Sequence, residues 1–269
     1  MSRLYRHPIY TAVADTGLYG SREAITVHPG FGEGWLSFRR FTHELNRRTG
    51  RPTLFIDSPR WDGDDVTRNP GGAPTALQRL GLNAAAQMQA FELTGATGIF
   101  HSLAAITGSL AAELDPALFS TIVIVSGAGQ LANERPGRLL RAVGRKSWHC
   151  LRDGLRQVHL PVGRANLASL LDGARYMITN PVRSAAEAWG AGNYYVRPLI
   201  RRLMDEGVTV YFVVARQDVV YDHDGAVTAL REYVPPSHII SLDGVHDLQL
   251  EPERLVDALI AHGLLSAAP

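Results

Sequence analysis

The amino-acid sequence predicts an α/β protein in which helices flank a mostly parallel central sheet and a helical segment is inserted between two strands. Short runs rich in β-branched and aromatic residues alternate with segments whose apolar residues recur at helical spacing. The first two of these runs end at glycine or proline loops, which punctuate regular structure. The alternation breaks once, for nearly 80 residues after Gly129, and then resumes. One sheet with one long insertion is the simplest organisation that accounts for these observations.

The first half of the chain supplies strands and helices in alternation. Apolar residues at positions 35, 36, 38, 41 and 45 follow a helical period, and basic residues close that segment. The expected strands are residues 24–27, 53–56, 97–100 and 121–125, and the expected helices are residues 35–48, 76–93 and 103–114. Because helices separate these strands, we expect a parallel sheet that is covered on both faces.

The second half begins with the insertion. Between residues 129 and 207, glycine, proline and arginine punctuate short helical pieces such as residues 164–178. Alternation then returns with a strand at 208–215, a helix near 225–233, a strand at 238–242 and a last helix at 252–262. We therefore assign residues 1–128 and 208–269 to the core and residues 129–207 to a helical lid.

Charge also separates the insertion from the core. The net charge of the chain is +1, yet residues 129–207 hold 13 Lys and Arg against 6 Asp and Glu, whereas the remainder holds 14 against 20. The basic segment is either an ordinary solvated surface or a means of attracting an anionic substrate or an acidic carrier protein. Nucleic-acid binding is a poor explanation, because the total charge is near zero and no recognition motif accompanies the arginines.

Composition narrows the class of protein further. A hydrophobic fraction of 45% and a charged fraction of 20% are those of a globular domain. The N-terminus lacks the apolar core of a signal peptide, and no run reaches transmembrane length, so we expect a cytoplasmic protein without a membrane span. Cys150 is the only cysteine, which excludes an internal disulfide and a cysteine-based zinc cluster. We interpret it as a buried small residue rather than a reactive thiol.

Three residues with the side chains needed for acyl transfer follow predicted strands. In an open parallel sheet, ligands bind at the carboxyl ends of the strands, and Ser102, Asp218 and His246 all follow such ends. Serine needs a neighbouring base to accept its proton, and the base needs a carboxylate that orients it. We therefore predict Ser102 as nucleophile, His246 as base and Asp218 as the orienting acid. Three alternatives stay open. Asp222 or Asp224 could take the place of Asp218, Ser102 could be only a helix N-cap, and His246 could be a surface-loop residue.

Four motifs in chain order resemble those of α/β-hydrolases. The motifs are Phe100-His-Ser-Leu-Ala104 at the nucleophile elbow, Ala215-Arg-Gln-Asp218 at the acid loop, Gly244-Val-His246 with Leu250-Glu-Pro-Glu-Arg254 at the histidine loop and last helix, and His28-Pro-Gly-Phe-Gly32 at the oxyanion loop. The resemblance covers residues 20–265, with the insertion in the place of the family's lid. It implies a serine esterase or thioesterase with a catalytic triad. No pair among the nine other histidines has metal-ligand spacing within a supporting motif, so we expect no catalytic metal, and we expect no cofactor.

The resemblance also implies a binding site around the triad. The oxyanion would be held by the backbone amides of Phe31 and Leu103, although the extra Pro29 leaves the first donor uncertain by one residue. The expected pocket residues are Gly30, His101, Trp148, Trp189 and Tyr194, and the aromatic residues among them either line the pocket or pack the lid. The oxyanion loop is similar to that of thioesterase domains in peptide and polyketide assembly lines. A small acyl substrate, as a thioester of coenzyme A or of an acidic carrier protein, is therefore one expectation.

One position departs from the family pattern. Family members have small residues two before and two after the nucleophile, because the sharp turn brings these positions close to neighbouring backbone. Ala104 fits this pattern, whereas Phe100 requires either a widened turn or a distorted elbow. A second hypothesis therefore stands beside hydrolysis: a ligand-binding protein, lyase or cyclase that has reused the pocket.

Overall fold

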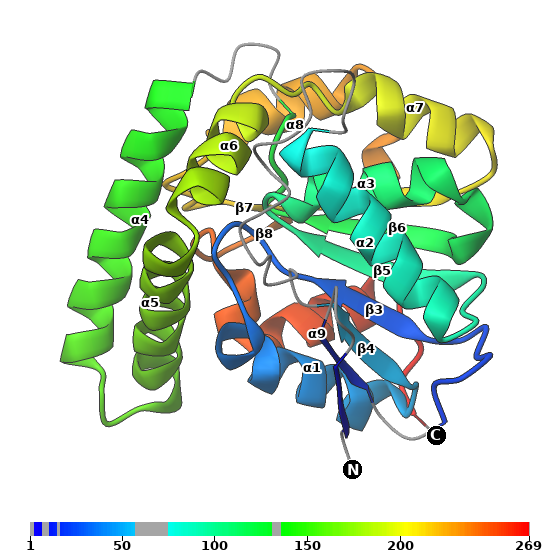
Figure 1. The fold of residues 1–269 in the computed structure, drawn as a ribbon, viewed down its shortest axis with the longest axis horizontal. Coiled ribbons are helices and arrows are strands. Elements are labelled where there is room, and N and C mark those ends of the chain that lie inside the picture. Colours follow the sequence, from blue (N-terminus) through cyan, green and yellow to red (C-terminus); the bar gives the residue numbers. More distant parts are fainter. Residues whose placement is uncertain (1–2, 7–10, 15–16, 57–74, 131–135, 269) are drawn as a thin grey trace.

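The central sheet confirms the predicted fold class. A computed structural model describes residues 3–6, 11–14, 17–56, 75–130 and 136–268, and within them one sheet has the strand order β1-β2-β4-β3-β5-β6-β7-β8 (Figure 1). Strands β3 to β8 pair in parallel. The strands are β1 (Arg3–Arg6), β2 (Thr11–Ala14), β3 (Ile25–His28), β4 (Thr53–Ile56), β5 (Ala96–His101), β6 (Phe119–Val125), β7 (Thr209–Ala215) and β8 (Ile239–Leu242).

Helices cover both faces of the sheet (Figure 1). The helices are α1 (Trp35–Thr49), α2 (Ala76–Ala90), α3 (Ala104–Leu114), α4 (Pro136–Arg156), α5 (Pro161–Thr179), α6 (Pro181–Ala191), α7 (Arg197–Asp205), α8 (His223–Arg231) and α9 (Pro252–Ala261). Helices α1 and α9 pack on one apolar cluster, and α2, α3, α7 and α8 pack on another. Neighbouring residues of one strand point to opposite clusters, as Leu54 and Phe55 do, because side chains alternate along a strand.

The antiparallel pair at the edge of the sheet was not predicted. Strand β1 pairs with β2, and β2 joins the parallel part through β4. Each strand has only four residues, so neither contributes an apolar run or a clear alternation that would mark it.

The insertion differs from the short helical pieces that were predicted. Helix α4 has 21 residues and α5 has 19. Pro161 and Pro181 stand at the start of α5 and α6. The first residue of a helix has no intrahelical partner for its backbone N–H, so a proline costs no hydrogen bond there, and its fixed φ suits the helix. These prolines therefore begin helices that the sequence interpretation had treated as broken.

Helices α4, α5 and α6 lie together beside the sheet, with α4 at the outer edge of the view in Figure 1.

Within the described residues, no helix combines the length and apolar character needed to cross a membrane.

Candidate active site

The turn between β5 and α3 holds Ser102 in a conformation that non-glycine residues rarely adopt. Its φ is +50°, in the left-handed region, where a side chain is strained. The Ser102 amide donates to the carbonyl oxygen of Val125 at 3.0 Å, and its carbonyl oxygen accepts from the amide of Ala128 at 2.9 Å. Both partners belong to the end of β6 and the loop after it, so the neighbouring strand holds the turn in place.

Phe100 fits beside this turn because glycines leave room for its ring. A Cβ atom at Gly98 would lie 2.6 Å from the ring, and one at Gly108 would lie 2.7 Å from it. The fully buried ring packs edge-on against His28, with 4.5 Å between the ring centroids. The structure therefore accommodates Phe100 through small residues on β5 and α3, a solution that differs from the predicted widened or distorted elbow.

Ser102, His246 and Asp218 are joined by two hydrogen bonds. His246 Nε2 lies 3.0 Å from Ser102 Oγ, and His246 Nδ1 lies 2.8 Å from Asp218 Oδ2. The other oxygen of Asp218 accepts from the backbone amides of Val220 and Tyr221, at 2.7 and 3.0 Å. With the proton on Nδ1, the imidazole donates to Asp218 and accepts from the serine hydroxyl, which is the arrangement that a general base requires.

Asp222 and Asp224, which were open alternatives to Asp218, have other partners. The carboxylate of Asp222 accepts from the amide of Gly225 at the start of α8, and Asp224 is exposed and pairs with His223. Burial alone would raise the pKa of Asp218. The charge and hydrogen bond of His246, together with the two backbone amides, outweigh burial and hold that pKa below its ordinary value. Asp218 is thus kept ionised beside the imidazole.

The loop after β3, which the sequence predicted to supply an oxyanion-hole amide, packs directly against the turn at Ser102. A Cβ atom at Gly30 would lie 2.9 Å from the Cβ of Ser102, so only glycine permits this approach. The Gly30 amide donates to Glu33 Oε2 at 2.7 Å and is therefore engaged. Phe31 and Leu103, the two residues predicted to supply amides, line one cavity together with Ser102 and His246.

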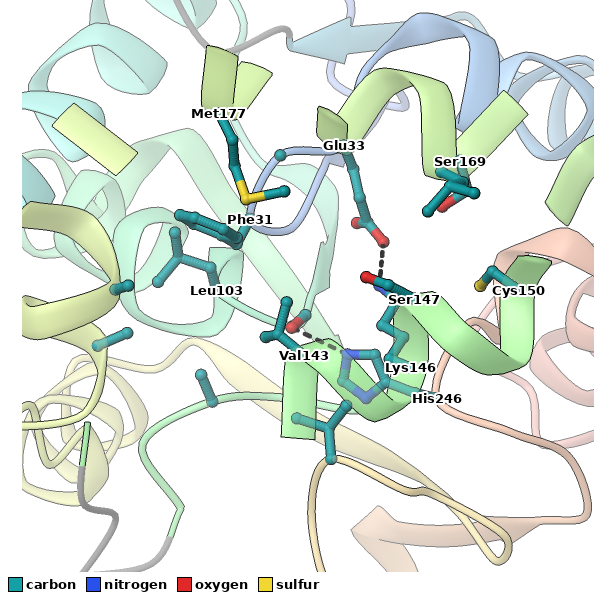
Figure 2. A pocket seen from close by; sticks show the side chains of 18 of the residues that line it. Phe31, Glu33, Leu103, Val143, Lys146, Ser147, Cys150, Ser169, Met177 and His246 are labelled. Carbon is teal, nitrogen blue, oxygen red and sulfur yellow. Dashed lines mark hydrogen bonds and ion pairs between the residues drawn. The ribbon is translucent and has the colours of Figure 1, made fainter. Parts of the chain in front are cut away.

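A buried ion cluster, formed by Glu33, His101, Lys146 and Asp247, lies next to the three hydrogen-bonded side chains. Glu33 contacts Lys146 Nζ at 3.1 Å (Figure 2) and His101 Nδ1 at 2.7 Å. Lys146 Nζ also lies 2.7 Å from Asp247 Oδ1. These residues come from the loop after β3, the end of β5, helix α4 and the loop after β8. The cluster therefore ties the insertion to three separate segments of the core.

Charge compensation inside the cluster opposes the effect of burial. Burial would raise the pKa of Glu33, but His101 and Lys146 hold it well below its ordinary value. Burial would likewise lower the pKa values of His101 and Lys146, but the neighbouring carboxylates raise both. This cluster was not predicted, although one signal was present: Lys146 is the single lysine among the 27 Lys and Arg residues of the chain.

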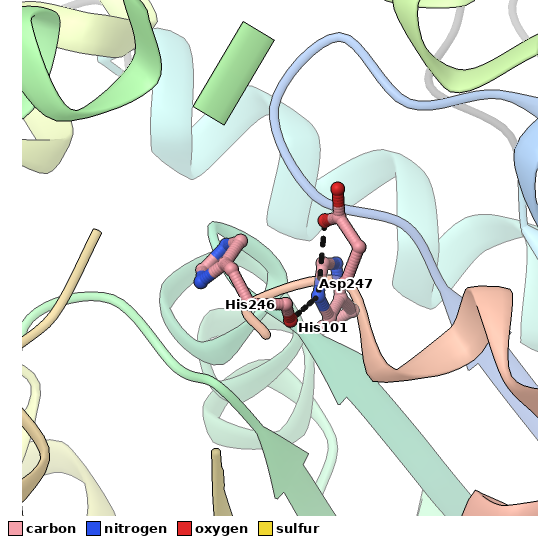
Figure 3. Close-up of side chains that lie close together, drawn as sticks. All are labelled: His101, His246 and Asp247. Atoms are coloured by element: carbon pink, nitrogen blue, oxygen red, sulfur yellow. Dashed lines mark hydrogen bonds and ion pairs between the residues drawn. The ribbon is translucent and has the colours of Figure 1, made fainter. Parts of the chain in front are cut away.

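His101, His246 and Asp247 lie close enough together to be considered as metal ligands. One ligand atom from each falls within 4.8 Å of the others (Figure 3). However, His101 bonds Glu33 through Nδ1 and the carbonyl oxygen of His246 through Nε2, at 3.1 Å. The nitrogens of His246 face Asp218 and Ser102. Because the ring nitrogens already have hydrogen-bond partners, the group is better described as part of the buried network than as a metal centre.

A largely apolar cavity opens above Ser102 and His246 (Figure 2). One wall comes from the loop after β3 and the turn before α3, and the facing wall comes from the insertion. Apolar lining residues include Phe31, Leu103, Val143, Leu170, Ala174 and Met177.

None of the five predicted pocket residues lines this cavity. Trp148 and Trp189 are 63% and 68% exposed, and Tyr194 packs against the apolar cluster beneath α3 and α7. Gly30 belongs to the loop after β3 and His101 to the end of β5, and neither lines the cavity. Helix phase explains Trp148: it stands two residues from both Lys146 and Cys150, which line the cavity, and so points away from it.

Cys150 is buried in the wall of the cavity, in agreement with its interpretation as a small packed residue. Burial, followed by the charge of Asp247, raises the pKa of its thiol to about 12. The thiol is therefore protonated at neutral pH and a weak nucleophile.

Known proteins resemble this chain in structure but not detectably in sequence. No protein-family model and no curated protein sequence matches it. Among solved structures, a hydrolase from Pseudomonas aeruginosa PA01 has a TM-score of 0.66 at 17% identity, covering 97% of both chains. A carboxylesterase from Nitrososphaera gargenis has a TM-score of 0.64 at 16% identity, covering 97% of this chain and 98% of that one. A bromoperoxidase from Bacillus anthracis has a TM-score of 0.65 at 11% identity, covering 98% and 100%. At such identities the likeness shows a shared fold alone.

Proposed function

We propose that this chain, which has the α/β-hydrolase fold, is a serine hydrolase that cleaves a carboxylic ester or an acyl thioester through an acyl-enzyme. One observation carries the proposal: Asp218, His246 and Ser102 form a continuous chain of hydrogen bonds at the floor of an apolar cavity. The strained conformation of Ser102 adds support, because such strain is concentrated at functional sites.

The reaction follows from these positions. Ser102 Oγ attacks the acyl carbon while its proton passes to His246 Nε2, and the imidazolium is stabilised by Asp218. The resulting oxyanion would accept from the amides of Phe31 and Leu103. Collapse expels the alcohol or thiol, which takes the proton from His246. A water molecule then attacks the acyl-enzyme, giving its proton to His246, and the free acid leaves as Ser102 recovers a proton.

The cavity favours an apolar acyl group. Its lining is mostly aliphatic, and within the described lining the charged side chains of Glu33 and Lys146 are paired with each other. A carrier-bound or coenzyme A thioester remains a candidate substrate beside simple esters.

We further propose that residues 129–207 act as a lid. The described helices α4, α5 and α6 supply the cavity wall that faces Ser102. Asp172 of α5 also accepts from the amide and the hydroxyl of Ser37, at 3.0 and 2.7 Å, near the start of α1. Together with Lys146, this contact holds the insertion against the core.

A non-hydrolytic function was suggested by Phe100. Since Gly98 and Gly108 accommodate the ring, Phe100 no longer favours that alternative over hydrolysis.

Covalent labelling tests the proposed function. A fluorophosphonate probe should label the wild-type protein at Ser102, and p-nitrophenyl esters or acyl thioesters should be turned over. Ser102→Ala should lose both properties, whereas Ser147→Ala, in the wall of the same cavity, should keep both. Wild-type protein that neither reacts with the probe nor hydrolyses any member of an ester and thioester panel would contradict the proposal.

A further inference from the structure

The outward side of α4, α5 and α6 exposes an unusual number of large apolar side chains. Among the described residues, nine of the fourteen exposed large hydrophobic side chains lie between positions 148 and 189. Six of them are more than 60% exposed: Trp148, Leu155, Leu171, Ile178, Val182 and Trp189. Soluble proteins seldom gather so many exposed apolar residues on one part of the surface without a partner.

Arginines share this surface and outnumber its carboxylates. Six described arginines of these helices are exposed: Arg138, Arg141, Arg145, Arg156, Arg164 and Arg175. Only three carboxylates occur between residues 136 and 191: Asp153 is partly exposed and pairs with Arg152, Asp172 accepts from Ser37, and Glu187 is buried against Arg183. The surface is therefore both apolar and strongly positive.

The spacing along α4 places these residues on one side of the helix. Positions 138, 141, 145, 148, 152 and 155 are separated by three or four residues and read Arg, Arg, Arg, Trp, Arg and Leu. Residues at that spacing align along a helix. Ala142, Lys146 and Cys150 point the other way, toward the core, and α4 forms the outer edge of the molecule in Figure 1.

We propose that this basic–apolar face, the outward side of α4, α5 and α6, docks the protein on an anionic lipid surface. Arginines attract acidic headgroups, and exposed Trp, Leu and Ile side chains between them enter the boundary of the acyl chains, which is the composition of surface-binding helices. A second copy of the chain is a poor occupant, because a symmetric contact would bring identical arginines together. The charge complementarity points to an acidic partner, and the number of exposed aliphatic side chains favours lipid over a folded acidic protein.

The cavity and this face share helix α5. Met177 lines the cavity and is also 42% exposed, next to Ile178. An acyl chain drawn from the lipid surface would enter beside Met177 and reach Ser102, a step that rests on the proposed function. Docking itself does not depend on hydrolysis.

Vesicle co-sedimentation with the full-length Ser102→Ala protein tests docking without turnover. The protein should bind vesicles of phosphatidylcholine containing one third phosphatidylglycerol, should bind pure phosphatidylcholine much less, and should be released by high salt. Arg141→Glu with Arg145→Glu should weaken binding at least about 25-fold, since each arginine near the surface contributes about fivefold. Ile178→Ser with Trp189→Ser should weaken it at least about tenfold.

Matched changes elsewhere control for net charge and for apolar area. Two double variants change exposed residues outside the face: Arg39→Glu with Arg231→Glu for charge, and Leu82→Ser with Leu114→Ser for apolar area. Each should leave vesicle binding within about twofold of that of the Ser102→Ala protein. Equal loss in both charge-reversal pairs would overturn the proposal. Absence of wild-type binding to the anionic vesicles would also overturn it. So would a wild-type dimer that becomes monomeric in the Ile178→Ser, Trp189→Ser variant while vesicle binding stays unchanged. Failure to bind vesicles leaves fluorophosphonate labelling of the wild-type protein untouched, so the two proposals are separated.

Discussion

At the scale of single residues, backbone strain at Ser102 is opposed by the hydrogen bonds and the side-chain packing around it. Ser102 is strained at a φ of +50°, and backbone hydrogen bonds to Val125 and from Ala128 hold it there. Phe100, two residues earlier, fills the space that Gly98 and Gly108 leave open. The conformation of the proposed nucleophile therefore depends on close packing between β5, β6 and α3.

Gly108→Ala tests that packing. The added methyl group would lie 2.7–2.8 Å from three atoms of the Phe100 ring, which is itself fully buried. We expect the free energy of unfolding to fall by about 1–3 kcal/mol, the usual cost of overpacking. Esterase activity should fall as well, because a displaced ring disturbs the turn at Ser102. Urea denaturation and ester hydrolysis measure the two effects.

Gly144→Ala is the matched control. Gly144 also lies inside a helix, but a Cβ atom there meets nothing within 4 Å. The substitution should raise stability by about 0.5–1 kcal/mol, because alanine loses less backbone entropy in a helix. A similar loss of stability at both glycines would contradict the packing explanation.

His28 predicts a pH dependence of stability. Burial lowers the pKa of its imidazole to about 3 from an ordinary value of 6.5. Between these values the unfolded chain binds a proton that the folded chain excludes, so stability falls as the pH decreases below 6.5. Between pH 7 and pH 5 we expect His28 to account for about 2 kcal/mol of the loss.

His28→Asn should remove that part of the pH dependence, whatever its effect at pH 7. His262→Gln, at an exposed histidine, should leave the pH dependence as in the wild type. The measurement is urea denaturation at a series of pH values. An unchanged slope in His28→Asn would show that the imidazole is not the group responsible.

At the scale of secondary-structure elements, Lys146 joins α4 to the core. Its ammonium lies between the carboxylates of Glu33 and Asp247, and its loss would leave two buried negative charges with only His101 to compensate them. We expect Lys146→Met to lower the free energy of unfolding by about 3–5 kcal/mol. Thermal or urea denaturation measures this loss.

Two variants separate charge from packing in this prediction. Arg145→Met removes an exposed charge from the same helix and should change stability by less than about 0.5 kcal/mol. Lys146→Met combined with Asp247→Asn removes one charge of each sign and should recover part of the lost stability. If the double variant is no more stable than Lys146→Met, charge compensation is not the role of the lysine.

At the scale of the whole molecule, the cavity exists only because the insertion lies against the core. Ala174 of α5 lines it, so a larger side chain there shortens the space above Ser102. Ala174→Phe should lower kcat/KM for long-chain p-nitrophenyl esters and change kcat/KM for p-nitrophenyl acetate much less. We expect the ratio of the two values to shift by at least about tenfold, since even one methylene is worth that much in an apolar pocket.

Ala185→Phe is the control for this change. Ala185 lies on α6 but is exposed, so the same enlargement there should leave chain-length preference as in the wild type. A parallel fall of kcat/KM for all chain lengths in Ala174→Phe would mean that this cavity does not hold the acyl group.

The sequence by itself determined the alternation of strands and helices, the position of the insertion and the order of Ser102, Asp218 and His246. Each of these features depends on a short segment of sequence, in which an apolar run ends at a loop and a polar residue follows it. In a parallel sheet, strand ends lie along one edge, so local patterns also predict which side chains come near one another. The prediction of Ser102, Asp218 and His246 as a group depended on this regularity.

Only the tertiary structure decided how Phe100 is accommodated, which face of α4 borders the cavity, and that Glu33, His101, Lys146 and Asp247 form one cluster. Each of these depends on residues distant along the chain, such as Glu33 and Asp247, or on the rotation of a helix about its axis. The predicted pocket role of Trp148 illustrates this, since a shift of two residues along a helix turns a side chain to the opposite side. Long-range packing and charge compensation, which leave no local pattern, account for what sequence alone did not reveal.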